Sequence, residues 1–550
     1  MGMNHWALFD GVAQVVPDRT AIAFRGTYLS YATLAERARR LAHVLIDHGF
    51  GAVTPRAQLA GWESGQDHVG LYLHNGAEYL EATFGANAAR AVPFNVNYRY
   101  VEDELAYLLD DADTAALVFH GTFAPTLAAA LPRLRRPPLL LQVDDGSGHA
   151  LLPGALDYEA ALAVAAADPL DTEPSDDDLY ILYTGGTTGM PKGTLWRQAD
   201  IFDAVLNLFS PAGGALSLSV AEHAAAVLDN PTTTLLPLPP FMHGAAQWMA
   251  LGGLIGGATV VIQDTVDRLD PVDVWHTVAR EKVAAMLFVG DAFARPLCDE
   301  LERPGAAYDT SSLTFIATGG AITSPGAKQR LLGLLPQVLL ADSAGSSETG
   351  SQLSQLSVAG SHSSSGTFEV VPGTCVVADD LGTVLEPGHE GIGWLAREGT
   401  IPLGYLGDEE KTRRTFPVID GRRMVVPGDR ARLLADGRVE LLGRESVTIN
   451  TGGEKVFAEE VEQAILRHPD VDDVLVVGRP SDRWGHEVVA VVQLRAGATV
   501  SDHDILDAAA THIASYKVPK DLVRVDRVGR SPSGKPDYGW ARTVVSSASL

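Results

Sequence analysis

Cysteine is scarce in this chain. Cys298 and Cys375 are the two cysteines among 550 residues, and they stand far apart. Two distant cysteines in so long a chain make neither a disulfide scaffold nor a zinc-binding motif. Residues 1–10 also lack the basic start and the apolar run of a secretory signal. We therefore expect a protein of the reducing cytoplasm.

Basic residues are few relative to acidic ones. The chain has 42 Lys and Arg against 69 Asp and Glu, which gives a formal net charge of −27. Such a surface repels nucleic acid and anionic lipid headgroups. We therefore expect no nucleic-acid partner, and an anionic ligand would need a local site of backbone amides and a few well-placed cations.

One uncharged stretch, residues 244–263, approaches the length that spans a bilayer. It is broken by Gly252, Gly253, Gly256 and Gly257, and it ends in a β-branched run. A buried helix, a glycine turn and a buried strand explain this pattern better. The sequence therefore predicts no integral membrane span.

Short apolar runs alternate with alanine-rich helical stretches along most of the chain. Runs at residues 69–73, 115–119, 138–143 and 258–262 read as strands, and this alternation predicts an α/β fold. The last 100 or so residues have a smaller α+β pattern of their own. We expect two domains, residues 1–445 and 446–550, with the boundary in the loop near residues 444–453.

The sharpest local signal is residues 183–193, which read YTGGTTGMPKG and follow an apolar run at 179–182. Glycines let the backbone curl so that amide groups converge on an anion, and the threonine hydroxyls and Lys192 add donors. It is not a Walker loop, because Pro191 precedes the lysine and Gly193 follows it. The alternative, a Gly/Thr-rich surface turn, explains less of this pattern, so we interpret the segment as a phosphate-binding loop.

This segment closely resembles the phosphate-binding signature of the adenylate-forming superfamily, which includes acyl-CoA synthetases, luciferases and nonribosomal adenylation domains. Further segments resemble the other motifs of that family, in the expected order: residues 237–244, 318–321, 342–348, 404–412, 427–429, 443–454, 516–519 and 531–535. Taken alone, each of these is more often a turn, a helix start or a packed residue. Their order and spacing carry the resemblance, which covers roughly residues 10–545.

The resemblance implies a large N-terminal domain of several subdomains, with mixed sheets and a barrel-like part, and a small mobile α+β C-terminal domain. It implies catalytic roles for Lys535, His243 and Glu348, and a Mg²⁺ site at Glu348 and Thr184, since hard cations prefer oxygen ligands. The residues that it assigns to binding ATP and coenzyme A are Thr184, Gly185, Gly186, Thr187, Thr188, Gly189, Lys192, Gly319, Gly320, Ala321, Asp342, Ser343, Ala344, Gly345, Ser347, Asp429, Arg444, Gly452 and Gly453.

The sequence departs from the family pattern at two of these positions and at the hinge. Ala344 stands where many members carry an aromatic that stacks on adenine, and Ser347 stands where threonine is usual. Ser446 falls at the pivot of the hinge, where most members have Asp or Lys. The first departure raises the question of what contacts the adenine ring in this chain.

The function implied is an AMP-forming acyl-CoA ligase, with ATP, Mg²⁺ and coenzyme A as cofactor and co-substrates. Residues 243–248, 290–293 and 318–321, the expected acyl pocket, are rich in small residues and contain no Lys or Arg, which favours a long-chain fatty acid or a steroid side-chain acid. Three alternatives stay open: an adenylating enzyme that loads a carrier protein, a luciferase-like oxygenase, and an inactive nucleotide- or lipid-binding protein. A homo-oligomer also stays open.

Overall fold

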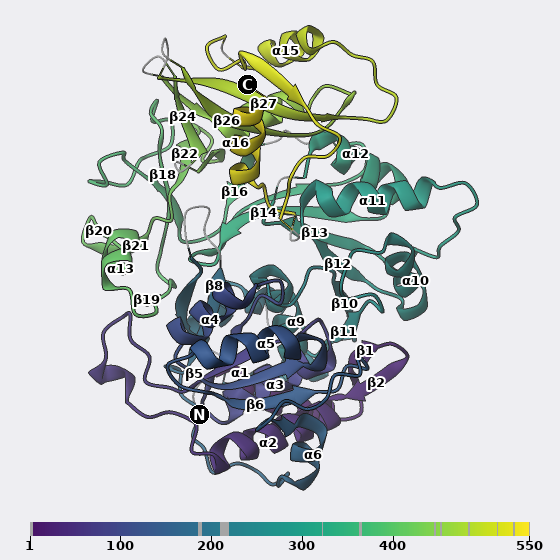
Figure 1. The fold of residues 1–550 in the computed structure, drawn as a ribbon, viewed down its shortest axis with the longest axis vertical. Coiled ribbons are helices and arrows are strands. Elements are labelled where there is room, and N and C mark those ends of the chain that lie inside the picture. The colour runs from purple at the N-terminus through teal and green to yellow at the C-terminus, as the bar shows by residue number, and fades with distance from the viewer. Residues whose placement is uncertain are drawn as a thin grey trace.

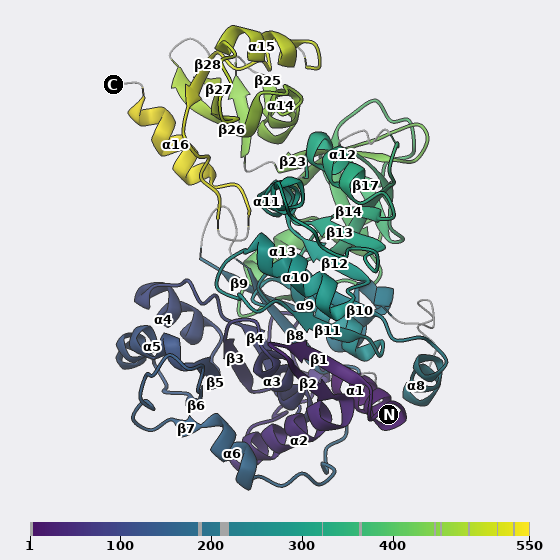
Figure 2. The ribbon, with the colours of Figure 1, turned by 90° about the vertical axis from the view of Figure 1, so that its right-hand side faces the viewer.

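The computed structural model describes residues 4–184, 190–209, 219–321, 323–361, 366–444, 447–451, 454–481, 485–513, 515–531 and 534–548. Figures 1 and 2 show the chain rising from its N-terminal part at one end of the long axis to residues 447–548 at the other. Three sheets organise the described residues.

The first sheet lies in the N-terminal part and supplies the strand that leads into the 183–193 segment. Its central strands β3, β4 and β5 are buried throughout and pair in parallel, while β8 and β9 pair antiparallel. In spatial order its strands are β19 (Gly404–Tyr405), β9 (Lys192–Arg197), β8 (Leu179–Thr184), β4 (Val92–Asn95), β3 (His68–Tyr72), β5 (Thr114–His120), β6 (Leu139–Val143) and β7 (Leu156–Asp157).

The second sheet is mixed. Its first half, from β1 to β14, is parallel, and its second half, from β15 onward, is antiparallel. In spatial order its strands are β2 (Thr27–Ser30), β1 (Thr20–Phe24), β11 (Thr259–Ile262), β10 (Thr234–Pro237), β12 (Ala285–Phe288), β13 (Phe315–Gly319), β14 (Leu339–Ser346), β15 (Gly350–Ser357), β16 (Thr367–Val370), β23 (Val439–Arg444), β22 (Asp429–Leu433), β18 (Gly393–Glu398), β21 (Arg422–Val425) and β20 (Val418–Ile419), with β17 (Thr374–Val377) beside β18.

The helices of the larger part cover these two sheets, as Figure 1 shows for α3 and α5 over the first sheet and α10 to α12 beside the second. They are α1 (His5–Val15), α2 (Tyr31–Asp47), α3 (Ala77–Ala88), α4 (Glu102–Asp111), α5 (Ala124–Ala130), α6 (Tyr158–Val164), α7 (Gln198–Ala204), α8 (Val220–Leu228), α9 (Gly244–Ile255), α10 (Pro271–Glu281), α11 (Gly290–Glu302), α12 (Pro325–Leu334) and α13 (Glu409–Thr415).

The uncharged stretch 244–263 has the predicted organisation. It forms the buried helix α9, a turn at Gly257 with a φ of 80°, and the fully buried strand β11. None of the helices in the described ranges combines the length and the apolarity that a bilayer crossing requires. The predicted buried helix, turn and strand are therefore confirmed.

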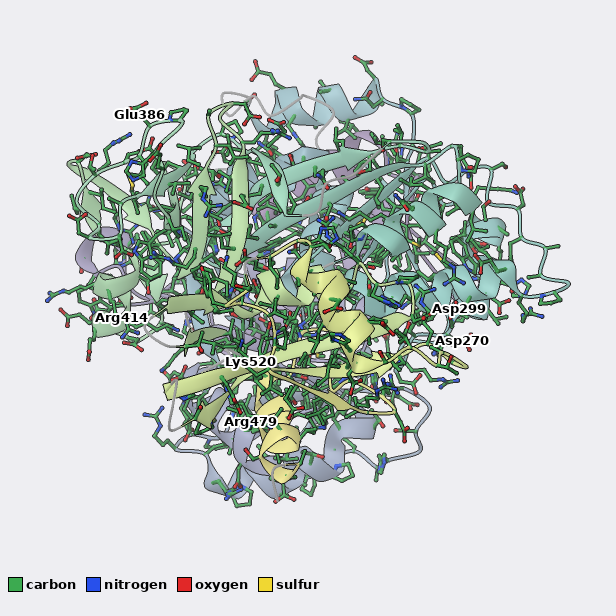
Figure 3. The ribbon with its side chains drawn as sticks, turned by 90° about the horizontal axis from the view of Figure 1, so that it is seen from above. Asp270, Asp299, Glu386, Arg414, Arg479 and Lys520 are labelled. Carbon is green, nitrogen blue, oxygen red and sulfur yellow. The ribbon has the colours of Figure 1, made fainter. Side chains whose placement is uncertain are left out.

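Residues 447–545 build a hydrophobic core of their own around the third sheet, separate from the cores of the larger part. The elements are β24 (Thr448–Thr451), β25 (Glu454–Phe457), α14 (Ala458–Ile465), β26 (Val471–Ser481), β27 (Gly485–Leu494), α15 (Asp502–Ala510), β28 (Asp521–Arg524) and α16 (Tyr538–Ser547). Seen from above in Figure 3, this part overlies the centre of the molecule, with Arg479 and Lys520 labelled on it. The α/β class with mixed sheets and a smaller C-terminal part is confirmed, whereas the boundary between residues 445 and 446 lies outside the described residues and stays a prediction.

Candidate active site

A cavity of about 300 Å³ lies where the two sheets of the larger part meet the C-terminal part. All three regions contribute to its lining: β8 ends there, β9 begins there, the end of β14 lines it, and Glu459 and Lys535 reach it from the C-terminal part. The predicted site residues that line it are Thr184, Lys192, Gly320, Ala321, Asp342, Ser343, Ala344, Gly345, Ser347, Glu348, Asp429, Arg444 and Lys535. Residues as far apart in sequence as Thr184 and Lys535 thus line one cavity.

Glu348 follows β14 and points its carboxylate at the ring hydroxyl of Tyr405. The Tyr405 hydroxyl donates to Oε1 at 2.7 Å. Burial would raise the pKa of Glu348, but the Tyr405 hydrogen bond and the nearby Arg444 charge outweigh it and lower that pKa. Glu348 is therefore a carboxylate at neutral pH, as a metal ligand must be.

Hydroxyl groups beside Glu348 add further oxygen donors. Thr184 Oγ1 and Ser347 Oγ lie 2.8 Å apart, and the backbone carbonyl of Ser347 accepts from Trp196 Nε1 at 2.8 Å. Among the described residues there is no cluster of three or more His, Cys, Asp or Glu that would hold a metal unaided. This sparse set of hard oxygens fits Mg²⁺ that is shared with the phosphates of a nucleotide.

Lys192 begins β9, opposite Thr184 in the register of the β8–β9 pair. Its ammonium lies 3.5 Å from Asp111 and 3.8 Å from Asp408. Burial alone would lower the pKa of Lys192, but Asp111 and its other polar neighbours raise it. Lys192 therefore stays a cation, and the carboxylates of Asp111 and Asp408 hold it beside the predicted phosphate-binding segment.

Asp342 lies on β14 and forms a buried ion pair with Lys328 of α12. Lys328 is 2% exposed and also donates to Gln355 at 3.3 Å, so one Asp342 oxygen is already engaged. Nearby, Ala344 packs against a cluster that contains Phe368, and Phe368 itself lines the cavity. An aromatic ring does therefore reach this wall, from β16 instead of from position 344.

Asp429 and Arg444 are direct partners across the antiparallel pair of β22 and β23. Arg444 Nε donates to Asp429 Oδ1 at 3.3 Å. A carboxylate beside a guanidinium suits a vicinal diol that is next to a phosphate. The carboxylate accepts hydrogen bonds from the two hydroxyls, and the guanidinium donates to the phosphate oxygens. The strand register thus joins two motifs that are 15 residues apart.

Lys535 reaches the cavity on a tight loop that docks on α11. Gly534 has a φ of 80°, and a Cβ there would lie 3.2 Å from the Cβ of Ala292. An ion pair between Arg295 of α11 and Asp472 of β26 fastens the two parts together. The side chain of Lys535 keeps accessible surface because it projects into the open cavity, yet the surrounding protein atoms and Arg444 lower its pKa.

His243 precedes α9, and the described lining of the cavity includes neither His243 nor Gly319. Burial and the nearby charge of Lys535 lower the pKa of His243 to about 3, so the ring is neutral at physiological pH. Its Nε2 atom is buried, and no described residue is its hydrogen-bond partner. Gly319 instead abuts β14, where a Cβ would lie 2.5 Å from the Ser343 carbonyl oxygen.

Residues 9–406 match the family described as AMP-binding enzyme, and residues 460–535 match the AMP-binding enzyme C-terminal domain. The chain belongs to the AMP-binding enzyme family.

Relatives extend this match over almost the whole chain. The chain is 52% identical to the medium-chain acyl-CoA ligase Mig of Mycobacterium avium, covering 98% of this chain and 97% of that one. It is 40% identical to 3-oxocholest-4-en-26-oate–CoA ligase of Rhodococcus rhodochrous, covering 98% and 96%. The fold is that of anthranilate CoA ligase AuaEII bound to anthranoyl-AMP, with a TM-score of 0.81 at 20% identity over 100% of this chain and 99% of that one.

The family match and the relatives at 40% identity or more confirm the resemblance to the adenylate-forming superfamily and the acyl-CoA synthetase class, whose members use ATP, Mg²⁺ and coenzyme A. The roles of the individual residues in this site stay predictions. Gly185, Gly186, Thr187, Thr188, Gly189, Gly452, Gly453 and the pivot Ser446 lie outside the described residues.

The sequence motifs did not predict several of the residues that contribute to this site. Asp111, Lys328 and Phe368 stand outside every motif, and each reaches the site from a different element. Glu459 and Gln463 of α14 also line the cavity. Helical spacing does place Glu459 and Gln463 on one face of α14, but no local signal says what that face meets.

Glu459 of α14 lies where the C-terminal part contacts Gly443 of β23, so its protonation state should influence that contact. Its carboxylate packs closely on Gly443: if residue 443 had a Cβ atom, that atom would lie 2.1 Å from Glu459 Oε2. Burial, with the charge of Asp429 adding to it, raises the pKa of Glu459 from 4.5 to about 7. A raised pKa means that docking is favoured when Glu459 is protonated, so docking should weaken as pH rises from about 4.5 to about 7 and change little above that.

We expect the Glu459→Gln enzyme to lose this part of its pH dependence, because a neutral amide needs no proton to be buried. The measurement is the rate of acid-dependent pyrophosphate release on either side of pH 7, compared with Glu460→Gln, whose carboxylate pairs with Lys517 away from the cavity. Profiles of equal shape for the wild type and Glu459→Gln would contradict the assignment.

Proposed function

We propose that this chain joins a long-chain fatty acid or a steroid side-chain acid to AMP, and then transfers the acyl group to coenzyme A. The observation that carries the proposal is the cavity where Lys192, Glu348, Asp429, Arg444 and Lys535 meet. An inactive nucleotide-binding descendant would be free to lose any of them. The names of the relatives support the acid class, since they include medium-chain, medium- and long-chain and 3-oxocholest-4-en-26-oate ligases.

In the first half-reaction the substrate carboxylate attacks the α-phosphorus of ATP, and pyrophosphate leaves from the opposite side. The protein's task is to position the two reactants and to stabilise charge on the phosphate oxygens. Lys192 and the 183–193 segment would hold the outer phosphates, and Asp429 with Arg444 would hold the ribose side. Lys535 would bridge the carboxylate and the α-phosphate. Mg²⁺ held by Glu348 and Thr184 would neutralise phosphate charge.

In the second half-reaction the thiol of coenzyme A attacks the acyl carbonyl carbon and AMP leaves with the carboxylate oxygen. We propose that residues 446–550 rotate about Ser446 between the two half-reactions, so that Lys535 withdraws and Gly452 and Gly453 line the path of the thiol. The ring of His243 is neutral, and it is close enough to Lys535 for the charge of that lysine to lower its pKa. We propose that this ring faces the acyl end of the site. A cytoplasmic location fits the two unpaired cysteines.

The test is pyrophosphate release with MgATP across a panel of acids, with and without coenzyme A. The panel runs from acetate through palmitate and aromatic acids to steroid side-chain acids. We expect turnover with long-chain or steroid side-chain acids and consumption of coenzyme A along with it. Pyrophosphate release without consumption of coenzyme A would point to a carrier protein as the acceptor, and no release with any acid would contradict the proposal.

A further inference from the structure

Lys411 brings a cation into the cavity that none of the predicted site residues accounts for. It lies in the first turn of α13 and lines the cavity wall. Its ammonium is 4.0 Å from the centre of the Tyr405 ring, and among the described residues no carboxylate oxygen comes within 4.0 Å of it. The two other basic residues of this helix, Arg413 and Arg414, are exposed, and Figure 3 shows Arg414 at the outer edge of the molecule.

The position of Lys411 is set by the same framework that places the phosphate-binding residues. β19 pairs with β9, so α13 emerges next to the strand that begins with Lys192. Asp408 caps α13 by accepting from the Lys411 backbone amide at 3.0 Å, and its other carboxylate oxygen lies 3.8 Å from the Lys192 ammonium. The Tyr405 ring beneath Lys411 carries the hydroxyl that binds Glu348. Lys411 therefore lies near both Lys192 and Glu348, the expected metal ligand.

The charges around Lys411 leave it short of a counter-ion. Burial lowers its pKa most, Glu348 and Asp408 raise it from a distance, and Lys192 and Arg414 lower it again. A partly buried ammonium without a close anion is unfavourable unless an anionic ligand completes its surroundings. The ring of Tyr405 compensates only in part.

We propose that Lys411 binds the β- and γ-phosphates of ATP, and the pyrophosphate that leaves, as a second cation opposite Lys192. This inference rests on the proposed function for its nucleotide, and it adds a residue to the site. The charges that act on Lys411 include Lys192, Glu348 and Asp408 but neither Asp429 nor Arg444. Lys411 should therefore contact the outer phosphates and leave AMP alone.

The test is equilibrium binding of MgATP, of inorganic pyrophosphate with Mg²⁺, and of AMP to the full-length protein without acid or coenzyme A. We expect Lys411→Met to weaken binding of ATP and pyrophosphate by about 10-fold to 100-fold, the effect of losing one charge-assisted hydrogen bond, with AMP binding unchanged. Lys411→Arg should restore most of the affinity. Arg414→Met is the matched control, because it removes a cation from the same helix outside the cavity, and it should bind all three ligands like the wild type.

Two results would overturn the inference: unchanged ATP and pyrophosphate binding in Lys411→Met, or an equal loss of AMP binding, which would indicate a merely structural role. AMP binding also reports that the variant is folded. The outcome is separable from that of the acid panel, because nucleotide binding is measured without any acid. A protein that released no pyrophosphate with any acid could still show the selective loss, and an active ligase could still fail to show it.

Discussion

Replacing Lys535 by alanine should slow acid-dependent pyrophosphate release by about 10²–10³-fold, the usual effect of removing one preorganised electrostatic group. The loop around Gly534 docks on α11 and holds the lysine in the cavity in front of Glu348 and Arg444. In the proposed second half-reaction this lysine has withdrawn. Thioester formation from preformed acyl-AMP and coenzyme A should therefore stay close to the wild-type rate.

The two half-reactions are measured separately, the first as pyrophosphate release and the second as thioester formed from chemically prepared acyl-AMP. Lys520→Ala is the matched control, since Lys520 is an exposed lysine on the same C-terminal part, labelled in Figure 3. Both of its half-reactions should be unaffected. Equal losses in both half-reactions of Lys535→Ala would refute the two-state alternation.

Replacing Lys328 by methionine should destabilise the larger part of the chain by about 3–5 kcal/mol, because it leaves the buried Asp342 carboxylate without its cation. Burial already raises the pKa of Asp342, and loss of Lys328 would raise it further. A raised pKa makes the folded state favour the protonated acid, so the loss of stability should shrink as pH falls. The measurement is the midpoint of thermal unfolding at several pH values.

Two further variants separate this effect from general damage. Adding Asp342→Asn to Lys328→Met removes the unpaired charge and should recover part of the lost stability. Lys282→Met breaks the exposed pair with Asp309, and exposed pairs of this kind contribute about 0–1 kcal/mol. If the midpoint of thermal unfolding changed as little in Lys328→Met as in Lys282→Met, the buried pair would not be needed for the stability of the fold.

Much of the site was predictable because its residues sit in local motifs with local physical causes. Glycine and threonine after a buried strand indicate a phosphate loop, and the antiparallel strands that carry Asp429 and Arg444 bring two motifs face to face. The helix and the strand within residues 244–263 were likewise predictable, because the apolar pattern is interrupted by glycines that favour a turn. In such places the sequence neighbourhood and the three-dimensional neighbourhood coincide.

The remaining residues were not predictable, because their roles depend on contacts between distant elements. Asp111 ends α4 and pairs with Lys192 across 81 residues, and Phe368 reaches the wall near Ala344 through the pairing of β16 with both β15 and β23. Lys411 lay inside a recognised motif, yet its side chain reaches the cavity because β19 pairs with β9 and α13 packs on β19. Sequence patterns predict elements, but sheet order decides which side chains meet.

The most direct test of the whole account follows the oxygen atoms of the acid. The enzyme is given ATP, coenzyme A and an accepted acid whose carboxylate carries a heavy oxygen isotope, and the AMP and pyrophosphate are analysed by mass spectrometry. Attack of the carboxylate on the α-phosphorus predicts one labelled oxygen in AMP and none in pyrophosphate, because the thiol later breaks the bond between the acyl carbon and that oxygen. Unlabelled AMP, or label in pyrophosphate, would contradict an acyl-adenylate intermediate.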